Sequence, residues 1–505
     1  MCGIAAQYGG ADAGAGERML DRLAHRGPDG EGWVRAGGSW IGHRRLSIVD
    51  VDGGGQPLGD DRAGLWLTGN GEVYNHAEVR ERLGPDRFST ASDNEVALRL
   101  LDQEGPDALA TLEGMFAFVA AGGDGRFVAA RDPVGIKPLY WARRNGDVRF
   151  ASEIRTFDRE WLPDVRAFPP GFHWTPERGL TRFARAAPRV APDAVEDPEE
   201  DPPGHIIERL RDELIASVER QLMGDVPVGV FLSGGLDSSL IAAIAARYLG
   251  LCGERLQTFA VGLDGSADLE AAREVARYLD TDHHERVYTA EEAVEALPEV
   301  VRVIESFDPS LVRSAVPNYL LAELTAREVK VVLTGEGADE LFAGYEYLRE
   351  MGDAASLHAE LVRTVEGLHN LNLQRCDRVT MAHGLEARVP FLDTQVIGFA
   401  LGLPPEWKLA APGRPEKLIL RQAFDGWLPE RFLWRQKSQF GDGSGAASVL
   451  QERFEESVSE AELEAERHES SPPLRTREEL AYWRIFREAL AGVRSEGTIG
   501  RFATA

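Results

Sequence analysis

The sequence is poor in cysteine and contains no long apolar run. Of its 505 residues only three are cysteines, Cys2, Cys252 and Cys376, an odd number at spacings that match neither a disulfide framework nor a zinc site. No uninterrupted apolar stretch reaches the roughly 18 residues of a membrane-spanning helix, and the N-terminus has no basic region followed by an apolar core. We therefore expect a protein of the reducing cytoplasm with no membrane partner.

Basic residues are scarce relative to acidic ones. Lys and Arg number 56 against 83 Asp and Glu, which gives a formal net charge of −27. This charge repels nucleic-acid phosphates and anionic lipid surfaces, so no nucleic-acid partner is expected. What the chain does have is length: 505 residues with 43% hydrophobic content exceed one ordinary core and predict two or three domains.

The clearest change of composition lies at residues 188–203, where five prolines and six acids occur without apolar periodicity. We place a domain linker there. Upstream, β-like runs at 115–120 and 126–131 flank a glycine-rich turn, the pattern of an antiparallel hairpin, and helical periodicity appears at 16–25 and 94–103. This first part of the chain therefore predicts antiparallel sheets covered by helices.

Downstream of the linker the rhythm changes. Helical stretches alternate with β-like runs at 226–232, 256–263, 284–289 and 329–335. Such alternation predicts a parallel α/β sheet. Beyond Gly337 the chain reads as mostly helical, with charged faces at 351–385 and 446–492.

Cys2 is the first residue that points to chemistry. Removal of Met1, which the small second side chain permits, would make Cys2 the N-terminal residue with its thiol beside a free α-amine. That amine titrates near pH 8, roughly 2 units below a lysine, so it can take the thiol proton and later protonate a leaving amine. A cysteine in second place can also occur by chance, and only the motifs around it decide between the two interpretations.

Three polar clusters follow in the same domain. Residues 43–49 (HRRLSIV) offer a guanidinium able to grip a carboxylate through two hydrogen bonds. Residues 69–76 (GNGEVYNH) contain an Asn-Gly pair that could hold an oxyanion or form a plain hairpin turn. Residues 92–95 (SDNE) open a helix, so one of them is expected to be its N-cap, while Asp93 could equally bind an ammonium group. Together these groups suit hydrolysis of the side-chain amide of a free amino acid.

The motifs carry a family resemblance. MCGI, HRGPDG (25–30), GHRRLSIVD (42–50), NGEVYNH (70–76), SDNE (92–95), RDPVGIKPLYW (131–141) and ASEI (151–154) resemble the class II glutamine amidotransferase domain. The resemblance implies an Ntn-type αββα sandwich in which Cys2 is the nucleophile and Asn70 and Gly71 are catalytic. It also implies that glutamine lies against Arg45, Leu46, Ser47, Ile48, Val49, Asn70, Gly71, Glu72 and Asp93.

The second domain opens with a different motif. SGGLDSS (233–239) follows a strand and begins a helix, where glycines let backbone N–H groups approach a phosphate. A glycine-rich turn without a ligand is the plain alternative. The motif lacks the GK[ST] ending of a Walker loop, so transfer of a γ-phosphate is not indicated. It resembles the pyrophosphate-binding loop of the ATP pyrophosphatases, which transfer AMP and release pyrophosphate.

A second loop, LTGEGADELFAGY (333–345), again follows a parallel strand, whose carboxyl end is where ligands bind. Asp237 and Asp339 would suit an octahedral Mg²⁺ that bridges ATP phosphates, with helix capping as the structural alternative. Further on, RQKSQF (435–440) places Lys437 in a loop, where its cation could neutralise the transition state of adenylyl transfer or simply lie on the surface.

Longer stretches resemble glutamine-dependent asparagine synthetase: 258–285, RSAVPNYLLAEL (313–324), LNLQRCDRVTMAHGLEARVPFLD (371–393) and KLILRQAF (417–424). The resemblance covers about 1–440. It implies an amidotransferase domain at 1–187, a linker at 188–203, and at 204–505 a parallel-sheet α/β ATP-pyrophosphatase domain, adenine nucleotide α-hydrolase-like, with a helical C-terminal part. Glu336 and Lys437 would be catalytic, Asp237 and Asp339 would hold Mg²⁺, and ATP would contact Leu232, Ser233, Gly234, Gly235, Asp237, Ser238, Val261, Thr334 and Gly335.

The resemblance implies a ligase with the small-molecule substrates glutamine, aspartate and ATP, and it leaves a homodimer open. Ammonia released at Cys2 would displace AMP from β-aspartyl-AMP, and an enclosed route should exclude water. The alternative is amidation of a different carboxylic acid in a natural-product pathway. Arg313 and Arg388 are candidate partners of the acceptor carboxylate, with structural ion pairs an equal alternative.

Two further groups of residues are expected to be structural. Cys252 and Cys376 lie in helical segments without a sequence partner and are expected to be core thiols. The pairs His283-His284 and Asp280-Asp282 could suggest a metal site, but no other ligand cluster accompanies them, so a structural or solvated role is expected.

Overall fold

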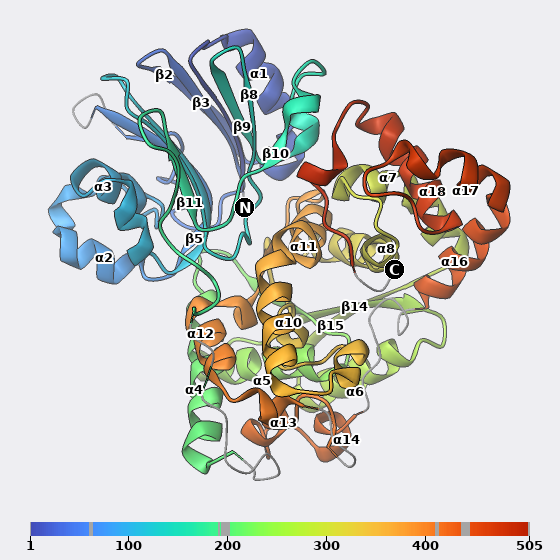
Figure 1. Ribbon diagram of the computed structural model, residues 1–505. Coiled ribbons are helices and arrows are strands. Elements are labelled where there is room, and N and C mark those ends of the chain that lie inside the picture. Colours follow the sequence, from blue (N-terminus) through green and yellow to red (C-terminus); the bar gives the residue numbers. More distant parts are fainter. Residues whose placement is uncertain are drawn as a thin grey trace.

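The computed structural model describes residues 2–59, 64–189, 192, 202–409, 414–435 and 445–502. Figure 1 shows the N-terminal part, blue to teal, packed beside a larger part built from the rest of the chain. Most of the linker expected at 188–203 lies outside the described residues. Among the described residues no helix is both long and apolar enough to cross a membrane.

The N-terminal domain consists of two six-stranded sheets in which all neighbouring strands pair antiparallel. The first has the order β10-β8-β9-β1-β3-β2, with strands β1 (Gly3–Tyr8), β2 (Gly30–Ala36), β3 (Ser39–Arg45), β8 (Tyr140–Arg144), β9 (Asp147–Ala151) and β10 (Arg166–Ala167). The second has the order β12-β11-β7-β6-β5-β4, with strands β4 (Leu58–Gly59), β5 (Leu65–Val73), β6 (Gly114–Gly122), β7 (Phe127–Arg131), β11 (Phe172–Thr175) and β12 (Gly179–Arg182). The hairpin expected at 115–131 is β6 and β7.

Helices cover both outer faces of this pair of sheets. Alternating apolar side chains such as Ile4, Val119 and Phe150 fill the space between the sheets. Helix α1 (Ala13–Asp21) packs Met19 against the first sheet, and helices α2 (His76–Leu83) and α3 (Glu95–Gln103) cover the second. The result is the αββα sandwich that the resemblance implied. The helix expected at 16–25 ends sooner, at Asp21, and a separate short turn spans Ala24–Arg26.

The second domain is built on a five-stranded parallel sheet in the order β15-β14-β13-β16-β17. Its strands are β13 (Val228–Phe231), β14 (Gln257–Leu263), β15 (Asp282–Tyr288), β16 (Val331–Leu333) and β17 (Glu386–Arg388). The helices around it are α4 (Gly204–Gln221), α5 (Leu236–Leu251), α6 (Ala267–Leu279), α7 (Ala290–Ile304) and α8 (Pro309–Thr325). The carboxyl ends of the neighbouring strands β13 and β16 therefore bring the 233–239 and 334–345 loops to one edge.

The remainder is helical, as expected. It comprises α9 (Ala338–Leu341), α10 (Ala354–Gly367), α11 (Asn372–Met381), α12 (Thr394–Gly402), α13 (Leu418–Ala423), α14 (Glu430–Leu433), α16 (Ala446–Ser457), α17 (Glu460–Glu466) and α18 (Arg477–Ala489). Figure 1 shows α11 close to where the two domains meet and α16 to α18 at the side of α7 and α8.

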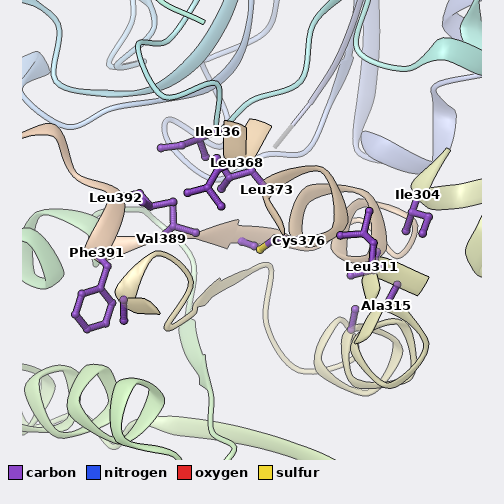
Figure 2. Packing of buried hydrophobic residues seen from close by; sticks show 14 of the residues in the cluster. Ile136, Ile304, Leu311, Ala315, Leu368, Leu373, Cys376, Val389, Phe391 and Leu392 are labelled. Atoms are coloured by element: carbon purple, nitrogen blue, oxygen red, sulfur yellow. The ribbon is translucent and has the colours of Figure 1, made fainter. Parts of the chain in front are cut away.

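An apolar cluster crosses the boundary between the domains. Figure 2 shows Ile136, which follows β7, lying beside Leu368 and Leu373, with Cys376 further along α11. Cys376 is buried, as expected for a core thiol. The same expectation is wrong for Cys252, which is exposed at the end of α5, next to Leu251 at 84% exposure. The apolar pattern of α5 continues beyond the surface that its first turns bury.

Charged side chains are also buried at this boundary. The Arg26 guanidinium donates to both carboxylate oxygens of Asp377 on α11, at 2.8 and 3.1 Å. Arg378 donates to Glu305 at 3.0 Å, and Glu305 accepts from the backbone N–H groups of Ile154 and Arg155 at 2.9 and 2.7 Å. Because these charges are paired and hydrogen-bonded, they can lie between the domains without water.

Candidate active sites

Cys2 lies buried at the start of β1, in the first sheet of the sandwich. Its backbone nitrogen donates to Asn70 Oδ1 at 3.0 Å, and its thiol lies 3.9 Å from the carbonyl oxygen of Leu46. Burial raises the pKa of the Cys2 thiol, so the group is mostly protonated and needs a base to become a thiolate.

Asn70 completes the surroundings of the nucleophile. The residue is fully buried on β5, and while its Oδ1 accepts from Cys2, its Nδ2 has no hydrogen-bond partner. A buried amide donor without a partner costs free energy unless a ligand satisfies it. Next to it, Gly71 has a φ of +134°, and a Cβ there would clash with the carbonyl oxygen of Met115. The Asn-Gly pair therefore lies within paired strands and does not form the plain hairpin turn.

Asp93 and Asn94 brace this strand from the side. Asp93 accepts from the Val73 N–H at 2.7 Å, and Asn94 donates to the Gly71 carbonyl at 3.0 Å. Burial raises the pKa of the Asp93 carboxyl. Asn94 is the N-cap of α3, as expected for one of residues 92–95, although its side chain makes no capping hydrogen bond. The structure thus brings Cys2, Asn70 and Asp93 to one region of the sandwich.

Arg45 points elsewhere. Its guanidinium donates to the backbone carbonyls of Asp50 and Val51 at 2.6 and 2.9 Å and so holds its own loop closed. Leu46 and Ile48 pack against Val331 of the second domain, and the Ser47 N–H donates to Asp29. Segment 45–49 thereby joins the glutamine-site candidates to the domain boundary.

A cavity of about 770 Å³ opens at the carboxyl edge of the parallel sheet. Expected nucleotide contacts that line it are Leu232, Ser233, Gly235, Asp237, Ser238, Thr334 and Gly335, together with Glu336 and Asp339. Val261 lies buried on β14 beside Ala260, which also lines the cavity. The size and the mixture of apolar and polar walls suit a nucleotide with a second small substrate.

The 233–238 loop is shaped by close contacts. Gly234 has a φ of +71°, and a Cβ there would lie 2.5 Å from the Ala271 Cβ on α6. Ser238 Oγ accepts from the Ser233 N–H at 3.2 Å, and Arg435 donates to the Gly234 carbonyl at 3.0 Å. Only a residue without a side chain fits where the loop turns into α5.

Asp237 and Asp339 converge on one point, and a lysine lies there. Lys417 Nζ is 2.6 Å from Asp237 Oδ2 and 2.5 Å from Asp339 Oδ1. The two carboxylates raise the pKa of the buried Lys417 above its ordinary value despite the opposing effect of burial. Lys417 was not singled out from the sequence, although it begins the KLILRQAF stretch.

Glu336 is held by Arg375 of α11, which also donates to Ser314 Oγ at 2.7 Å. Deeper in the wall, Glu340 accepts from the Tyr345 hydroxyl at 2.5 Å and from Asn372 at 3.0 Å. Nothing in the sequence distinguished Glu340 from an ordinary acidic residue in the first turn of a helix. Lys437, expected as the catalytic cation, lies outside the described residues.

Comparisons with known proteins cover both domains. A model described as a glutamine amidotransferase domain matches residues 1–170, and one described as asparagine synthase matches 209–353 and 349–495. Asparagine synthetase [glutamine-hydrolyzing] 3 of Arabidopsis thaliana is 40% identical over 489 residues, which cover 92% of this chain and 83% of that one. The chain belongs to the glutamine-hydrolysing asparagine synthetase family.

Other members of the asparagine synthetase family match as broadly. The probable enzyme of Schizosaccharomyces pombe is 40% identical over 520 residues, covering 96% of this chain and 92% of its own. That of Sandersonia aurantiaca is 39% identical, covering 88% and 87%. Among solved structures, a glutamine phosphoribosylpyrophosphate amidotransferase from B. subtilis covers 57% of this chain and 81% of its own at 19% identity, with a TM-score of 0.32 that is too low to carry an argument.

The two arginines considered for the acceptor carboxylate have different surroundings. Arg388 is fully buried on β17, where it donates to Glu386 at 2.6 Å and to the Gln221 carbonyl, also at 2.6 Å, and so makes a structural ion pair. Arg313 lines the cavity and pairs with Glu478 of α18. Of the two, only Arg313 lines the cavity.

The histidine pair takes part in packing. His283 Nδ1 lies 3.0 Å from Thr258 Oγ1, and the His284 ring stacks on Phe259 with centroids 5.1 Å apart. Within the described ranges no group of three or more His, Cys, Asp or Glu could hold a metal ion. The structural role expected for these histidines is consistent with both observations.

Proposed function

We propose that this chain makes asparagine from L-aspartate, ATP and L-glutamine as a magnesium-dependent ligase of the cytoplasm. The observation that carries the proposal is a buried Cys2 beside the Asn70 amide, whose Nδ2 has no hydrogen-bond partner, in one domain, with the SGGLDSS and TGEGADE loops opening on one cavity in the other. The first site suits hydrolysis of an amide, and the second suits activation of a carboxylate by ATP.

In the first half-reaction Cys2 attacks the side-chain amide of glutamine. The carbon–nitrogen bond breaks, ammonia leaves, and water hydrolyses the γ-glutamyl thioester. Loss of Met1 would place an α-amine at the Cys2 nitrogen, next to the thiol whose proton it would take, and the hydrogen bond to Asn70 Oδ1 at 3.0 Å would hold that nitrogen in place. Asn70 Nδ2 is the donor for the developing oxyanion.

In the second half-reaction the ATP phosphates lie at the 233–238 loop and the N-terminus of α5. Asp237 and Asp339 fit Mg²⁺, because two carboxylates that converge on a lysine ammonium mark a point that selects positive charge, and Mg²⁺ uses one or two carboxylates with substrate phosphates. The bound ion would neutralise phosphate charge. Glu336, held by Arg375, lies in the wall where β-aspartyl-AMP meets ammonia, and Lys437 stays the predicted cation for adenylyl transfer.

Ammonia has to pass between the domains. It is largely protonated in neutral water, and an acyl-adenylate hydrolyses there, so the path should exclude solvent. The apolar cluster around Ile136, Leu373 and Cys376 continues from the sandwich into the synthetase domain and suits such a path (Figure 2). Closure of a β-lactam, a related chemistry, needs no ammonia, and the glutaminase residues argue against it.

The test separates the two half-reactions. Cys2→Ala, or a variant that retains Met1, should lose glutaminase activity while synthesis from added ammonium survives, because only the first site uses the thiol and the amine. Cys252→Ala, at an exposed thiol, is the matched control and should change neither reaction. Asparagine and pyrophosphate are measured with glutamine or ammonium as nitrogen donor, and equal loss of both reactions in Cys2→Ala would overturn the assignment.

A further inference from the structure

The C-terminal segment of the chain, which carried no sequence signal, contributes to the wall of the synthetase cavity. Arg501 and Phe502 line it, together with Ser310, Arg313 and Ser314 of α8. The Phe502 N–H donates to Asp308 Oδ2 at 3.1 Å, and Asp308 Oδ1 caps α8 through the Leu311 N–H. One carboxylate thus fixes both the start of α8 and the segment that lies against it.

Two neighbouring acids of α18 hold two cations of this wall. Glu478 accepts from Arg313 Nε at 2.9 Å and from its Nη2, and Glu478 also accepts from the Tyr482 hydroxyl at 2.7 Å. Arg501 Nη2 lies 2.6 Å from Glu479 Oε1. Glu478 and Glu479 are 1% and 0% exposed, so both carboxylates lie behind the arginines that face the cavity.

At Lys417, Arg375 and Arg435, by contrast, the cation and its carboxylate partners both line the cavity. These carboxylates are Asp237 and Asp339, Glu336, and Asp268. Along α8 and the C-terminal segment, the arginines Arg313 and Arg501 line the cavity, and their partners Glu478 and Glu479 lie behind them. This wall therefore presents positive charge to a ligand, and a fixed guanidinium suits a carboxylate.

We propose that α18 and residues 490–502 complete the acceptor site: Glu478 positions Arg313, and Arg501 binds an acceptor carboxylate beside it. The inference rests on the proposed function, in which the acceptor is a small dicarboxylic amino acid whose two carboxylates need separate partners. The loops at β13 and β16 take the nucleotide, and the arginine wall takes the carboxylate that is not activated.

The experiment measures ammonium-dependent pyrophosphate release by the full-length chain at varied L-aspartate and varied ATP. Arg501→Gln and Glu478→Gln should each raise the KM for aspartate about tenfold or more, the loss expected for one charge-assisted contact, while the KM for ATP and the glutaminase activity stay within about twofold. Arg501→Lys, which keeps the charge, should recover part of the loss. Arg487→Gln is the matched control and should change nothing, because Arg487 lies on α18 with Glu478 but makes an exposed pair with Glu469.

Other results would count against a role of Arg501 in binding the acceptor. An unchanged KM for aspartate in folded Arg501→Gln, or equal rises in the KM for aspartate and ATP, would overturn the inference. If the parent releases no pyrophosphate with aspartate, the proposed acceptor is wrong, and the same comparison is made with the carboxylic acid that does drive release. Should Glu478→Gln fail to fold by thermal melting, the Arg501→Gln and Arg501→Lys pair decides.

Discussion

A single carboxyl group, Glu340, is placed to make stability depend on pH. It is 2% exposed, and burial, together with the nearby charge of Asp339, raises its pKa to about 7. Its Oε1 accepts from Tyr345 and Asn372, contacts that a glutamine at this position could keep. These hydrogen bonds favour the charged carboxylate, but burial and the charge of Asp339 outweigh them and favour the neutral form.

We expect Glu340→Gln to be increasingly more stable than the parent as pH rises from about 4.5 to 7. The folded pKa is raised, so the stabilising contribution of the protonated carboxyl is complete below the unfolded pKa and is lost as pH approaches the folded one. The difference in free energy of unfolding should grow by roughly 3 kcal/mol across that window. Denaturant unfolding of both proteins at several pH values measures it, with Glu104→Gln, at a partly exposed acid, as control. A pH-independent difference would contradict the raised pKa.

Residues whose role depends on neighbours distant in sequence were the hardest to predict. The order of motifs made Cys2, Asn70 and Glu336 site candidates, because each lies within a distinctive local pattern. Lys417 and Glu478 gave no such signal: each acts through partners about 80 to 180 positions away, Asp237 and Asp339 for one and Arg313 for the other. Local spacing contains no information on such pairs.

At the scale of elements, hydrophobic rhythm predicted four strands of the parallel sheet and failed for the fifth. The edge strand β17 has the sequence Glu386-Ala387-Arg388, which does not resemble a buried strand. Its two charges are buried because they neutralise each other, Arg388 Nε donating to Glu386 at 2.6 Å. A pattern based on apolar residues misses a strand whose charges pair internally.

A second prediction concerns Gly234, in the turn from β13 into α5. Gly234→Ala should lower ATP-dependent pyrophosphate release at least tenfold, because the left-handed backbone and the contact with Ala271 would force the loop away from α6. Glutaminase activity, measured in the same preparation, should not change.

Gly250→Ala, near the other end of α5, is the matched control. A Cβ at Gly250 meets nothing within 4 Å, so alanine should stabilise the helix by about 0.5–1 kcal/mol without changing activity. Normal pyrophosphate release by Gly234→Ala would show that the loop tolerates a side chain.

For the whole molecule, the buried charges between the domains predict that both unfold together. Glu305→Gln should lower the free energy of unfolding by about 3 kcal/mol, because Arg378 would stay buried with less compensation. Glu104→Gln, which breaks the exposed pair with Arg82, should cost less than about 1 kcal/mol. Calorimetry of each variant measures the effect, and a loss below 1 kcal/mol in Glu305→Gln would contradict a structural role for the pair.

The sequence predicted the order of the two domains better than it predicted the residues through which the domains contact each other. The sandwich and the parallel sheet each follow from local periodicity. The polar contacts that join them instead link residues distant in the sequence: Arg26 with Asp377, 351 positions apart, and Glu305 with the backbone of Ile154, 151 positions apart. From the sequence alone, charged residues of this kind are interpreted as solvent-exposed, because their buried partners are not known. The structure shows that they are the polar part of the domain boundary.

The exposure of Cys252 makes the protein easy to label at one position. Cys2 and Cys376 are buried, so a maleimide dye should attach to Cys252 while the fold is intact, and all three thiols should react after denaturation. Because α5 runs 16 residues, about 24 Å, from the 233–238 loop to Cys252, the dye would lie far from that loop. Counting the reactive thiols would thus provide a simple assay of folded molecules in any preparation.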